Sequence, residues 1–424
     1  MVNKDKATLG LSKTKKTEKL KPFQFNPYSA DFRLNPYPVY HHLRSENPIC
    51  NTIGGDWLFT RYEDVRAILR DHHVYSDNRP KLIEQKNKYF QNQGKSIQAL
   101  SDASNKFLFY MNPPDHNRLR RLVNKAFSPI VVEQMRPQIQ VAVNEYLDKA
   151  LSKKEMDIIG DFADLLPVNV IARMLGVPSS DAKEQLNQWA QVLVRVLDSL
   201  ISLEEYENIN KAILDFQEYF RELISKREKN PQDDLISYLI TARDESDHLS
   251  EEEVLSICIQ LFLAGEETTV NLIGNGMLAL LHHPEQMEKL RHKPEIIQNA
   301  VAEMLRYDSP IQMLCRIASD KLEIGGQTIQ KGEKMFLCLG SANRDPAKFD
   351  HPDRFDILRK KNPHLAFGDS IHYCLGAALA KTEAEIAINS LVQRLPNLKL
   401  ASDKLEWRKN ITLRGLKTLR VNFA

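Results

Sequence analysis

The sequence predicts a mainly α-helical fold with small β-sheets, and three observations lead to this prediction. Apolar residues recur at helical spacing through most of residues 113–305. Residues 311–358 instead contain short stretches in which apolar and polar residues alternate, separated by glycines at the expected turns, as in β-hairpins. The chain has no alternation of strands with helices and no G-x-G-x-x-G motif, which argues against a Rossmann nucleotide-binding domain. With 424 residues, 42% of them hydrophobic, it can bury a large core.

Charge and cysteine content argue against several classes of protein. The net charge is +2, so we expect no nucleic-acid partner. Residues 1–24 are basic but lack the apolar core of a signal peptide, and we expect a disordered tail there. No apolar run approaches the ~20 residues that span a bilayer, so we expect a soluble protein without membrane contact. The five cysteines form no C-x-x-C pair, which argues against a disulfide framework or a zinc ribbon and fits the cytoplasm.

The N-terminal region is predicted to combine short helices with a strand. Residues 35–49 and 63–71 have helical patterns, and residues 56–62 suit a strand. Residues 79–107 are rich in lysine, glutamine and asparagine and show little periodicity. We therefore expect a long loop there, which would be functional or mobile.

The longest predicted helix covers residues 249–283. Ser250 and Glu253 form an S-x-x-E capping box at its start, and Pro284 ends it. Its middle is apolar on every side, which is typical of a helix that runs through the centre of a large α-rich protein. Hairpin turns are then expected at Gly325–Gly326 and at residues 331–332, and a last helix over residues 375–395.

The stretch "HLAFGDSIHYCLG", residues 364–376, precedes that last helix. Cys374 lies at the predicted helix start, where backbone N–H groups and the helix dipole stabilise a thiolate. Gly368 and Gly376 permit positive φ and the close approach of a flat ligand, and Phe367 offers an aromatic wall. A thiolate in a dry pocket beside a flat face suits axial ligation of haem iron. A buried structural cysteine fits the local stretch equally well.

The spacing of this stretch resembles the haem-binding loop F-G-x-x-x-H-x-C-x-G of the cytochrome P450 family. The matching residues are Phe367, Gly368, His372, Cys374 and Gly376. The family usually has a second glycine where this chain has a serine, at position 370. If that position needs positive φ, the serine costs on the order of 1 kcal/mol.

A second motif, "AGEETT" at residues 264–269, lies within the long central helix and matches the family's A-G-x-[D/E]-T-T. Gly265 costs about 1 kcal/mol relative to alanine inside a helix, so it needs a reason. The chemical interpretation is an oxygen pocket in which Glu267 relays protons and Thr268 hydrogen-bonds dioxygen. The alternative is a helix crossing built from small residues, with the polar ones hydrated.

A third motif is the pair Glu303 and Arg306, one turn apart on a helix after Pro294. Most such pairs are surface ion pairs of little energetic value. In the family, E-x-x-R is a buried structural pair completed by another basic residue. Arg354 and Arg359 are both candidates for that residue.

Four further residues fit recognition of the haem propionates, which requires cations and donors near two carboxylates. His116 and Arg120 lie four apart and match the family's H-x-x-x-R. Arg316 follows the E-x-x-R helix at the family's interval, and His372 belongs to the cysteine loop. Each alone suits an ordinary surface charge, but together they occur in the family's order.

The resemblance covers about residues 25–421 and implies a single haem domain, residues 25–424, with the P450 prism fold. It implies haem b between the central helix and the cysteine loop, with Cys374 as the iron ligand. Residues Ala264 and Gly265 would line the haem together with Phe367, Gly368 and Gly376. The implied activity uses O2 to hydroxylate or epoxidise a hydrophobic small molecule, and similar bacterial members often serve secondary metabolism.

Electrons would come from a separate ferredoxin or flavodoxin with its reductase, because the chain has no flavin or iron–sulfur domain, and we expect a monomer. A docking face for an acidic redox partner would use basic residues, namely Arg121, Lys125, Lys360, Lys361 and Lys381. By analogy with the family, the predicted substrate pocket is mostly apolar and contains Phe107, Leu108, Leu263, Ile311, Met313 and Ile411.

Two other functions stay open at this point. The protein could use peroxide directly or isomerise its substrate, although peroxide-using members usually lack the acid–threonine pair. It could also be a haem-binding sensor without turnover, which would leave the proton relay unexplained. NADPH consumption linked to product, measured with a surrogate ferredoxin system, separates these functions from monooxygenation.

Overall fold

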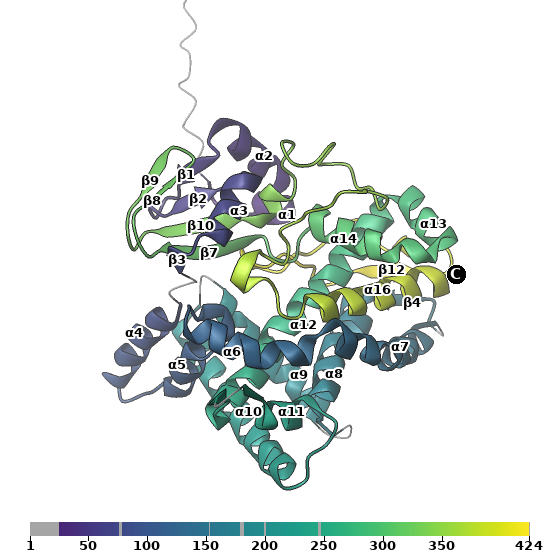
Figure 1. Cartoon of the computed structure of the whole chain (residues 1–424). Coiled ribbons are helices and arrows are strands. Elements are labelled where there is room, and N and C mark those ends of the chain that lie inside the picture. The colour runs from purple at the N-terminus through teal and green to yellow at the C-terminus, as the bar shows by residue number, and fades with distance from the viewer. Residues whose placement is uncertain are drawn as a thin grey trace, which may run out of the picture.

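A computed structural model describes residues 25–75, 79–151, 153–178, 182–198, 201–244 and 247–423. The predicted tail, residues 1–24, lies outside the described residues. Figure 1 confirms the predicted class, because helices form most of the described chain and the sheets are small. No helix among the described residues is both long and apolar enough to cross a membrane.

The β-rich part joins strands from the N-terminal region and strands from residues 313–338 in one five-stranded sheet. Its strands run in the order β1 (Ile49–Asn51), β2 (Trp57–Phe59), β10 (Lys334–Cys338), β7 (Met313–Ala318) and β3 (Val74–Tyr75). Strands β2 and β10 are parallel and the other neighbours antiparallel. Helices α1 (Ala30–Leu34), α2 (Tyr37–Glu46) and α3 (Tyr62–Arg70) lie with this sheet (Figure 1). The predicted helices and strand of the N-terminal region are thus confirmed.

One of the two predicted hairpin turns is correct. Gly325 and Gly326 have positive φ and connect β8 (Leu322–Ile324) to β9 (Gln327–Ile329). The turn at residues 331–332 does not close a hairpin, because β10 pairs with β7 and β2 instead of β9. The alternating pattern predicts a strand but does not identify its partner.

The loop predicted over residues 79–107 is wrong, because this stretch contains α4 (Arg79–Gln91) and α5 (Gln98–Asn105). Helix α4 buries Ile83, Asn87 and Phe90 on one face. The amide of Asn87 accepts a hydrogen bond from the Ile97 N–H (2.9 Å) and donates one to Gln98 (2.7 Å). Because a polar residue occupies the middle of the buried stripe, the helical period is hidden in the sequence.

The helical part surrounds one long central helix, α12 (Glu251–His282). The helices around it are α6 (Asp115–Asn124), α7 (Pro129–Leu151), α8 (Leu165–Met174), α9 (Ala182–Leu193), α10 (Leu203–Lys229), α11 (Leu235–Thr241), α13 (Pro284–His292), α14 (Ile297–Tyr307) and α16 (Ala377–Arg394). A short helix, α15 (Leu339–Ala342), follows β10. The minor sheets are β5 (Arg243–Asp244) with β6 (Asp247–His248), and β11 (Lys399–Leu400) with β12 (Arg420–Asn422) and β4 (Glu155–Asp157).

Helix α12 begins and ends as the sequence predicts. The Ser250 hydroxyl and the Glu253 carboxylate each accept the other residue's backbone N–H, which completes the capping box. Helices α8, α10, α14 and α16 pack around α12. A β-carbon added at Gly265 or Gly274 would lie 2.7 or 2.6 Å from an isoleucine side chain, Ile171 or Ile159. Glycine therefore allows close helix contact, which is the packing alternative considered for Gly265.

Candidate active site

The cysteine loop, residues 364–376, folds back on itself before α16 begins. The Cys374 N–H donates to the Phe367 carbonyl (2.9 Å), and the Tyr373 N–H donates to the Ser370 carbonyl (3.0 Å). Gly368 has φ of +71° and Ser370 has φ of +61°. The position where the family usually has glycine thus needs the left-handed region, and Ser370 carries a strain of about 1 kcal/mol.

Cys374 is half-buried and lies three residues before the first residue of α16. Desolvation raises the pKa of its thiol, whereas the Gly376 N–H, Arg120 and Lys381 lower it. The net shift is upward, so in the protein alone desolvation outweighs the expected stabilisation of a thiolate. A metal ion bound to the sulfur would reverse this balance, because a coordinating thiol is deprotonated.

Gly376 is the N-cap of α16 and has an ordinary φ of −85°. A β-carbon at this position would meet no atom within 4 Å. Space for a side chain is therefore present at position 376, and the glycine is not needed for backbone conformation.

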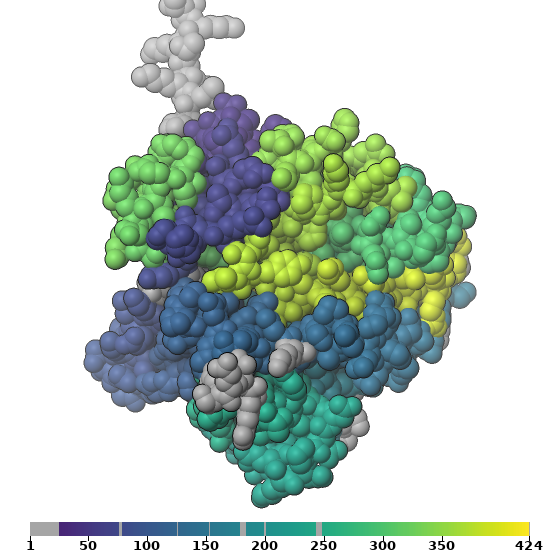
Figure 2. Space-filling view, viewed as in Figure 1, coloured from purple at the N-terminus to yellow at the C-terminus, as the bar shows by residue number. Residues whose placement is uncertain are grey.

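Two neighbouring helices hold the cysteine loop. The Asp369 carboxylate accepts hydrogen bonds from Arg66 (3.2 Å) and Arg70 (2.9 Å) of α3. Arg120 of α6 donates to the Tyr373 carbonyl (2.8 Å). Figure 2 shows the result, since the yellow chain near the C-terminus lies on the surface between the purple N-terminal helices and the blue α6 region.

His116, Arg120, Arg316 and His372, here called the cationic cluster, converge next to this loop. The rings of His116 and His372 lie 4.4 Å apart. Burial, together with Arg316, His116 and Arg120, lowers the pKa of His372 to about 3, so the ring is neutral. His116 is 1% exposed, and its Nε2 is buried without a hydrogen-bond partner.

The cationic cluster fits the propionates of a haem group. All charged groups that shift the pKa of His372 are cationic or can become cationic. A buried imidazole nitrogen without a partner costs free energy unless a ligand satisfies it. Two carboxylates placed here would offer negative charge to the arginines and a partner to His116 Nε2.

Part of the acid–threonine motif is accessible on one side of α12, and this accessible side is here called the opening at α12. Ala264 is exposed and Thr268 half-buried, whereas most residues around them in this helix are buried. The Thr268 hydroxyl donates to the Ala264 carbonyl (2.7 Å). Its oxygen therefore keeps lone pairs that can accept a hydrogen bond at this opening.

Several carboxyl groups gather behind this turn. Burial raises the pKa of Glu267, while Arg408 lowers it. Glu266 is 3% exposed, and burial, together with Asp164 and Glu267, raises its pKa to about 8. Burial raises the pKa of Asp164 to about 6 despite its ion pair with Arg408 (3.4 Å). The sequence interpretation missed Glu266 and Asp164, because Glu266 fills the variable position of the motif and Asp164 belongs to no motif.

The predicted substrate residues lie in separate clusters. Phe107, Leu108 and Leu263 are buried together in the helical core, where the Leu108 N–H donates to Gln260 of α12 (2.8 Å). Ile311 forms a β-bridge with Leu413. Met313 and Ile411 belong to another hydrophobic cluster, with Phe25, Phe32 and Tyr40.

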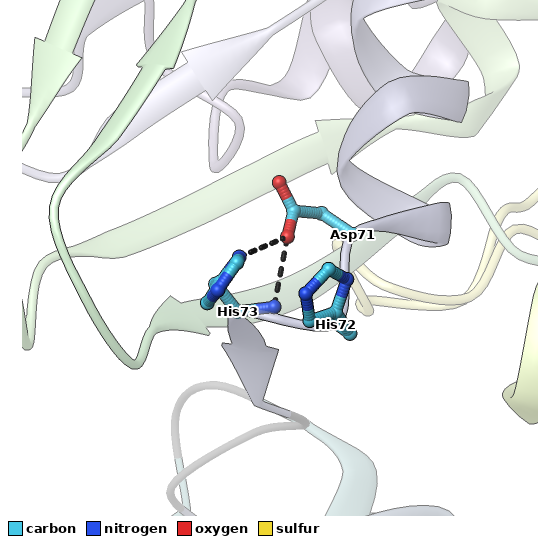
Figure 3. A group of neighbouring side chains, drawn as sticks. All are labelled: Asp71, His72 and His73. Carbon is cyan, nitrogen blue, oxygen red and sulfur yellow. Dashed lines mark hydrogen bonds and ion pairs between the residues drawn. The ribbon is translucent and has the colours of Figure 1, made fainter.

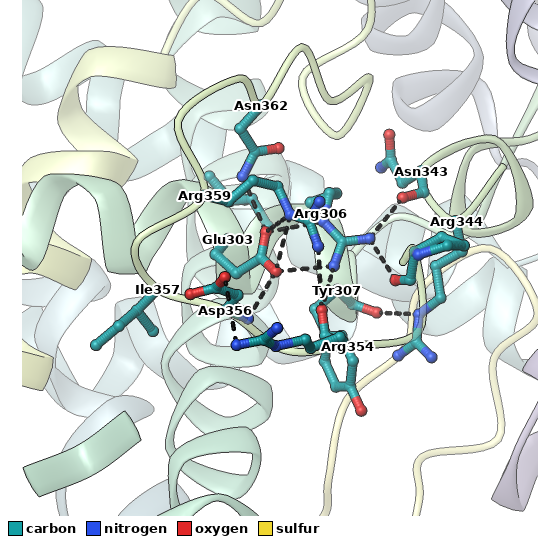
Figure 4. A network of polar contacts seen from close by, with 12 residues as sticks. Glu303, Arg306, Tyr307, Asn343, Arg344, Arg354, Asp356, Ile357, Arg359 and Asn362 are labelled. Atoms are coloured by element: carbon teal, nitrogen blue, oxygen red, sulfur yellow. Dashed lines mark hydrogen bonds and ion pairs between the residues drawn. The ribbon is translucent and has the colours of Figure 1, made fainter. Parts of the chain in front are cut away.

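Glu303 and Arg306 form a fully buried ion pair with two parallel contacts of 2.8 Å (Figure 4). Arg359 donates to both oxygens of Glu303 (3.2 and 3.0 Å), and Asn362 donates to one (3.1 Å). Arg354 contributes its backbone carbonyl to Arg306 (3.1 Å). The third basic residue is therefore Arg359, and we call Glu303, Arg306, Arg359 and Asn362 the Glu303 network.

A family model described as Cytochrome P450 matches residues 60–416. The biotin biosynthesis cytochrome P450 of Bacillus subtilis (strain 168) is 45% identical over 400 residues, which cover 93% of this chain and 98% of that protein. The polyketide biosynthesis cytochrome P450 PksS of the same organism is 38% identical over 415 residues, 96% of this chain and 100% of that protein. A crystal structure of P450BioI with an acyl carrier protein ligated to hexadec-9Z-enoic acid has a TM-score of 0.86 at 44% identity, covering 93% of this chain and 99% of the other.

Proposed function

The chain belongs to the cytochrome P450 family of monooxygenases, and we propose that it hydroxylates or epoxidises a hydrophobic small molecule. Three features of the structure support this proposal. These are a half-buried cysteine two residues before open space at Gly376, the cationic cluster of two arginines and two histidines, and the accessible side of the acid–threonine turn of α12.

Family membership implies a haem-thiolate cofactor. When bound, haem supplies the oxygen-activating chemistry, and a thiolate ligand favours O–O cleavage. We assign Cys374 as the iron ligand and the cationic cluster as the group that holds the propionates. The Gly376 N–H and Lys381 stabilise negative charge on the Cys374 sulfur, since both lower the pKa of its thiol.

Glu267 and Thr268 are proposed to deliver protons to the pocket. Because burial raises the pKa of Glu267, this carboxyl holds its proton at higher pH than an exposed glutamate. The Thr268 oxygen accepts at the opening while its own proton is held by the Ala264 carbonyl. A proton on Glu267 can therefore be passed to a group that Thr268 positions.

Thr268→Ala tests this role. The variant should load haem normally but divert reducing equivalents from product to peroxide. NADPH consumption, peroxide and product would be measured with a surrogate ferredoxin system, and Thr268→Ser, which keeps the hydroxyl, is the matched control. Full coupling in Thr268→Ala would contradict the role assigned to the hydroxyl, and substrate oxidation that needs no NADPH would contradict the monooxygenase.

The substrate is proposed to be an extended hydrophobic molecule of biosynthetic origin. The predicted pocket residues are apolar, and the relatives include P450 enzymes of biotin and polyketide biosynthesis and a vitamin D(3) 25-hydroxylase from Pseudonocardia autotrophica. A screen for substrate-induced spin shifts with fatty acids, polyketides and terpenoids tests this class. Tight binding of small polar molecules alone would contradict it.

An acyl chain carried by an acyl carrier protein is a second candidate substrate. The similarity that favours it is 44% identity to P450BioI, whose crystal structure contains such a carrier. The test compares free hexadecanoate with the same acyl group on a carrier protein. A spin shift at much lower concentration of the carrier-bound form supports this candidate, and equal potency of the two forms contradicts it.

The redox partner is proposed to be a ferredoxin or flavodoxin with its reductase in the cytoplasm. Arg121, Lys360 and Lys361 are exposed, and Lys381 is half-buried near Cys374. Lys125 belongs to the same predicted face, but its side chain lies outside those described. Charge reversal at Lys360 and Lys361 should slow reduction at low salt, where unscreened charges steer association. An unchanged reduction rate would contradict this docking face.

A further inference from the structure

Three side chains of types that bind metals lie together at the end of α3, directly after Arg70. Asp71, His72 and His73 each offer one ligand atom, and these atoms lie within 4.8 Å of one another. Among the described residues, this is the one group of three or more histidine, cysteine, aspartate or glutamate side chains within that limit. Figure 3 shows the three side chains around a single turn of the chain.

From this geometry we propose that Asp71, His72 and His73 form a surface site for a divalent transition metal ion such as Zn²⁺ or Ni²⁺. Two imidazoles and a carboxylate are ligands that Zn²⁺ accepts, with metal–ligand bonds of about 2.0–2.2 Å. Ligands of one tetrahedral zinc ion lie about 3.4 Å apart on this basis. Both histidines are exposed, so small side-chain rotations bring the three ligand atoms to that separation.

The turn that carries these ligands is fixed on both sides. Helix α3 ends at Arg70, whose side chain bonds to Asp369 (2.9 Å). On the other side, the His73 carbonyl accepts a hydrogen bond from the Ser319 N–H (2.9 Å), and Val74 pairs with Ala318. Because the backbone is already fixed, metal binding costs only the conformational entropy of the side chains.

The side chains are also partly oriented toward one another. One oxygen of Asp71 accepts the His73 N–H (2.8 Å) and lies 3.2 Å from the Nδ1 of the same residue, while the two imidazole rings lie 4.0 Å apart (Figure 3). The Asp71 oxygen and Nδ1 of His73 face each other at a distance close to the separation of two ligands on one tetrahedral zinc ion. A zinc ion can therefore replace the proton between these two atoms and bind both of them.

The site would bind its metal from solvent, with water completing the coordination. It favours ions that accept imidazole nitrogen over Mg²⁺ and Ca²⁺, which prefer oxygen ligands. Its affinity should be modest, because three exposed ligands leave the ion hydrated. The inference is independent of haem binding and of the proposed oxidation.

Isothermal titration of the haem-loaded, untagged protein with zinc chloride tests the site. The wild type should bind one zinc ion, and magnesium chloride should give no such event. His73→Ala should weaken zinc binding by about tenfold or more, and His72→Ala/His73→Ala should abolish the event. The haem absorption spectrum of each variant should match that of the wild type, because both side chains are exposed.

His41→Ala/His42→Ala is the matched control, since it removes another exposed pair of adjacent histidines, which lies on α2 outside any such group of three. This variant should bind zinc as the wild type does. The site would be refuted by a wild type that binds no zinc up to millimolar concentrations, by undiminished binding in His72→Ala/His73→Ala, or by loss of binding in the control.

Discussion

Two clusters of charged groups lie inside the molecule and differ in how their charges are balanced. In the Glu303 network, one carboxylate accepts from two guanidinium groups and an amide, and backbone carbonyls take further N–H groups (Figure 4). In the cationic cluster, two arginines and two histidines converge, and burial together with its neighbours drives His372 to the neutral form. The first cluster is satisfied by side chains and carbonyls of the chain, whereas the second contains the buried His116 Nε2 without a hydrogen-bond partner.

From this difference we propose that the first cluster serves the fold and the second a ligand. A buried ion pair is tolerated only when its remaining donors and acceptors are satisfied, and the Glu303 network meets that condition. A buried polar atom without a partner lowers stability until a ligand satisfies it, which is the situation of His116. We therefore expect substitutions in the Glu303 network to change stability, and changes in the cationic cluster to respond to pH and to haem.

The largest expected effect is that of Glu303→Ala. The substitution removes the carboxylate that pairs with both Arg306 and Arg359. Removing one partner of a buried ion pair costs about 3–5 kcal/mol. Urea denaturation would measure the change in free energy of unfolding. Glu288→Ala, at an exposed pair with Arg291, is the control and should cost less than about 1 kcal/mol. A similar small loss for both variants would contradict a structural role for the network.

The second effect concerns the cationic cluster and pH. His372 has a pKa of about 3 in the folded protein, and unfolding returns it toward the usual value of about 6.5. Between these values the unfolded chain binds a proton that the folded chain does not, so stability falls as pH decreases. The loss approaches about 1.4 kcal/mol per pH unit. In the haem-free proteins, His372→Gln should show a shallower loss than wild type, and parallel curves would refute the assignment.

The third prediction compares Arg354 and Arg359, which the sequence analysis left as two candidates for the basic residue that completes the Glu303–Arg306 pair. Arg359→Ala removes two charge-assisted hydrogen bonds to Glu303 and should cost about 2 kcal/mol. Arg354→Ala keeps the backbone carbonyl that Arg306 uses, so it should cost less than about 0.5 kcal/mol. Thermal or urea unfolding measures the loss of stability in each variant. A larger loss in Arg354→Ala than in Arg359→Ala would contradict the assignment of Arg359.

The smallest effect is expected at Ser370, in the loop that carries His372. Its φ of +61° suits glycine, so Ser370→Gly should raise the free energy of unfolding by at most about 1 kcal/mol. Gly368→Ala, at a φ of +71°, should lower it by about 1–2 kcal/mol, since space for the β-carbon is present and only the conformation is strained. Destabilisation by Ser370→Gly would mean that the serine makes a contribution beyond backbone strain.

Local signals predicted much of the fold and the motif residues. The capping box and Pro284 define α12, and the glycines at 325 and 326 define the β8–β9 hairpin, because these signals act through neighbouring residues. Helix α4 was missed because Asn87 is buried through bonds to Ile97 and Gln98, which lie beyond the helix itself. Its helical face becomes clear only when that contact is known.

Charge balance in the site could not be predicted, because it depends on which segments meet. Arg354 and Arg359 are five residues apart in one irregular segment, and the path of that segment decides which side chain reaches Glu303. Likewise, Asp164 and Arg408 meet near Glu266 from distant parts of the chain. Sequence motifs identify candidate residues, but desolvation and pairing follow from tertiary contacts.

The central claim is that Cys374 and the cationic cluster form a haem-thiolate site. The most direct measurement is the carbon monoxide difference spectrum of the reduced protein, compared among wild type, Cys374→Ala and Cys315→Ser, a control at another half-buried cysteine. We predict the red-shifted Soret band of a thiolate-ligated haem in the wild type and in Cys315→Ser, and its loss in Cys374→Ala. Retention of that band in Cys374→Ala, or its loss in Cys315→Ser, would contradict the claim.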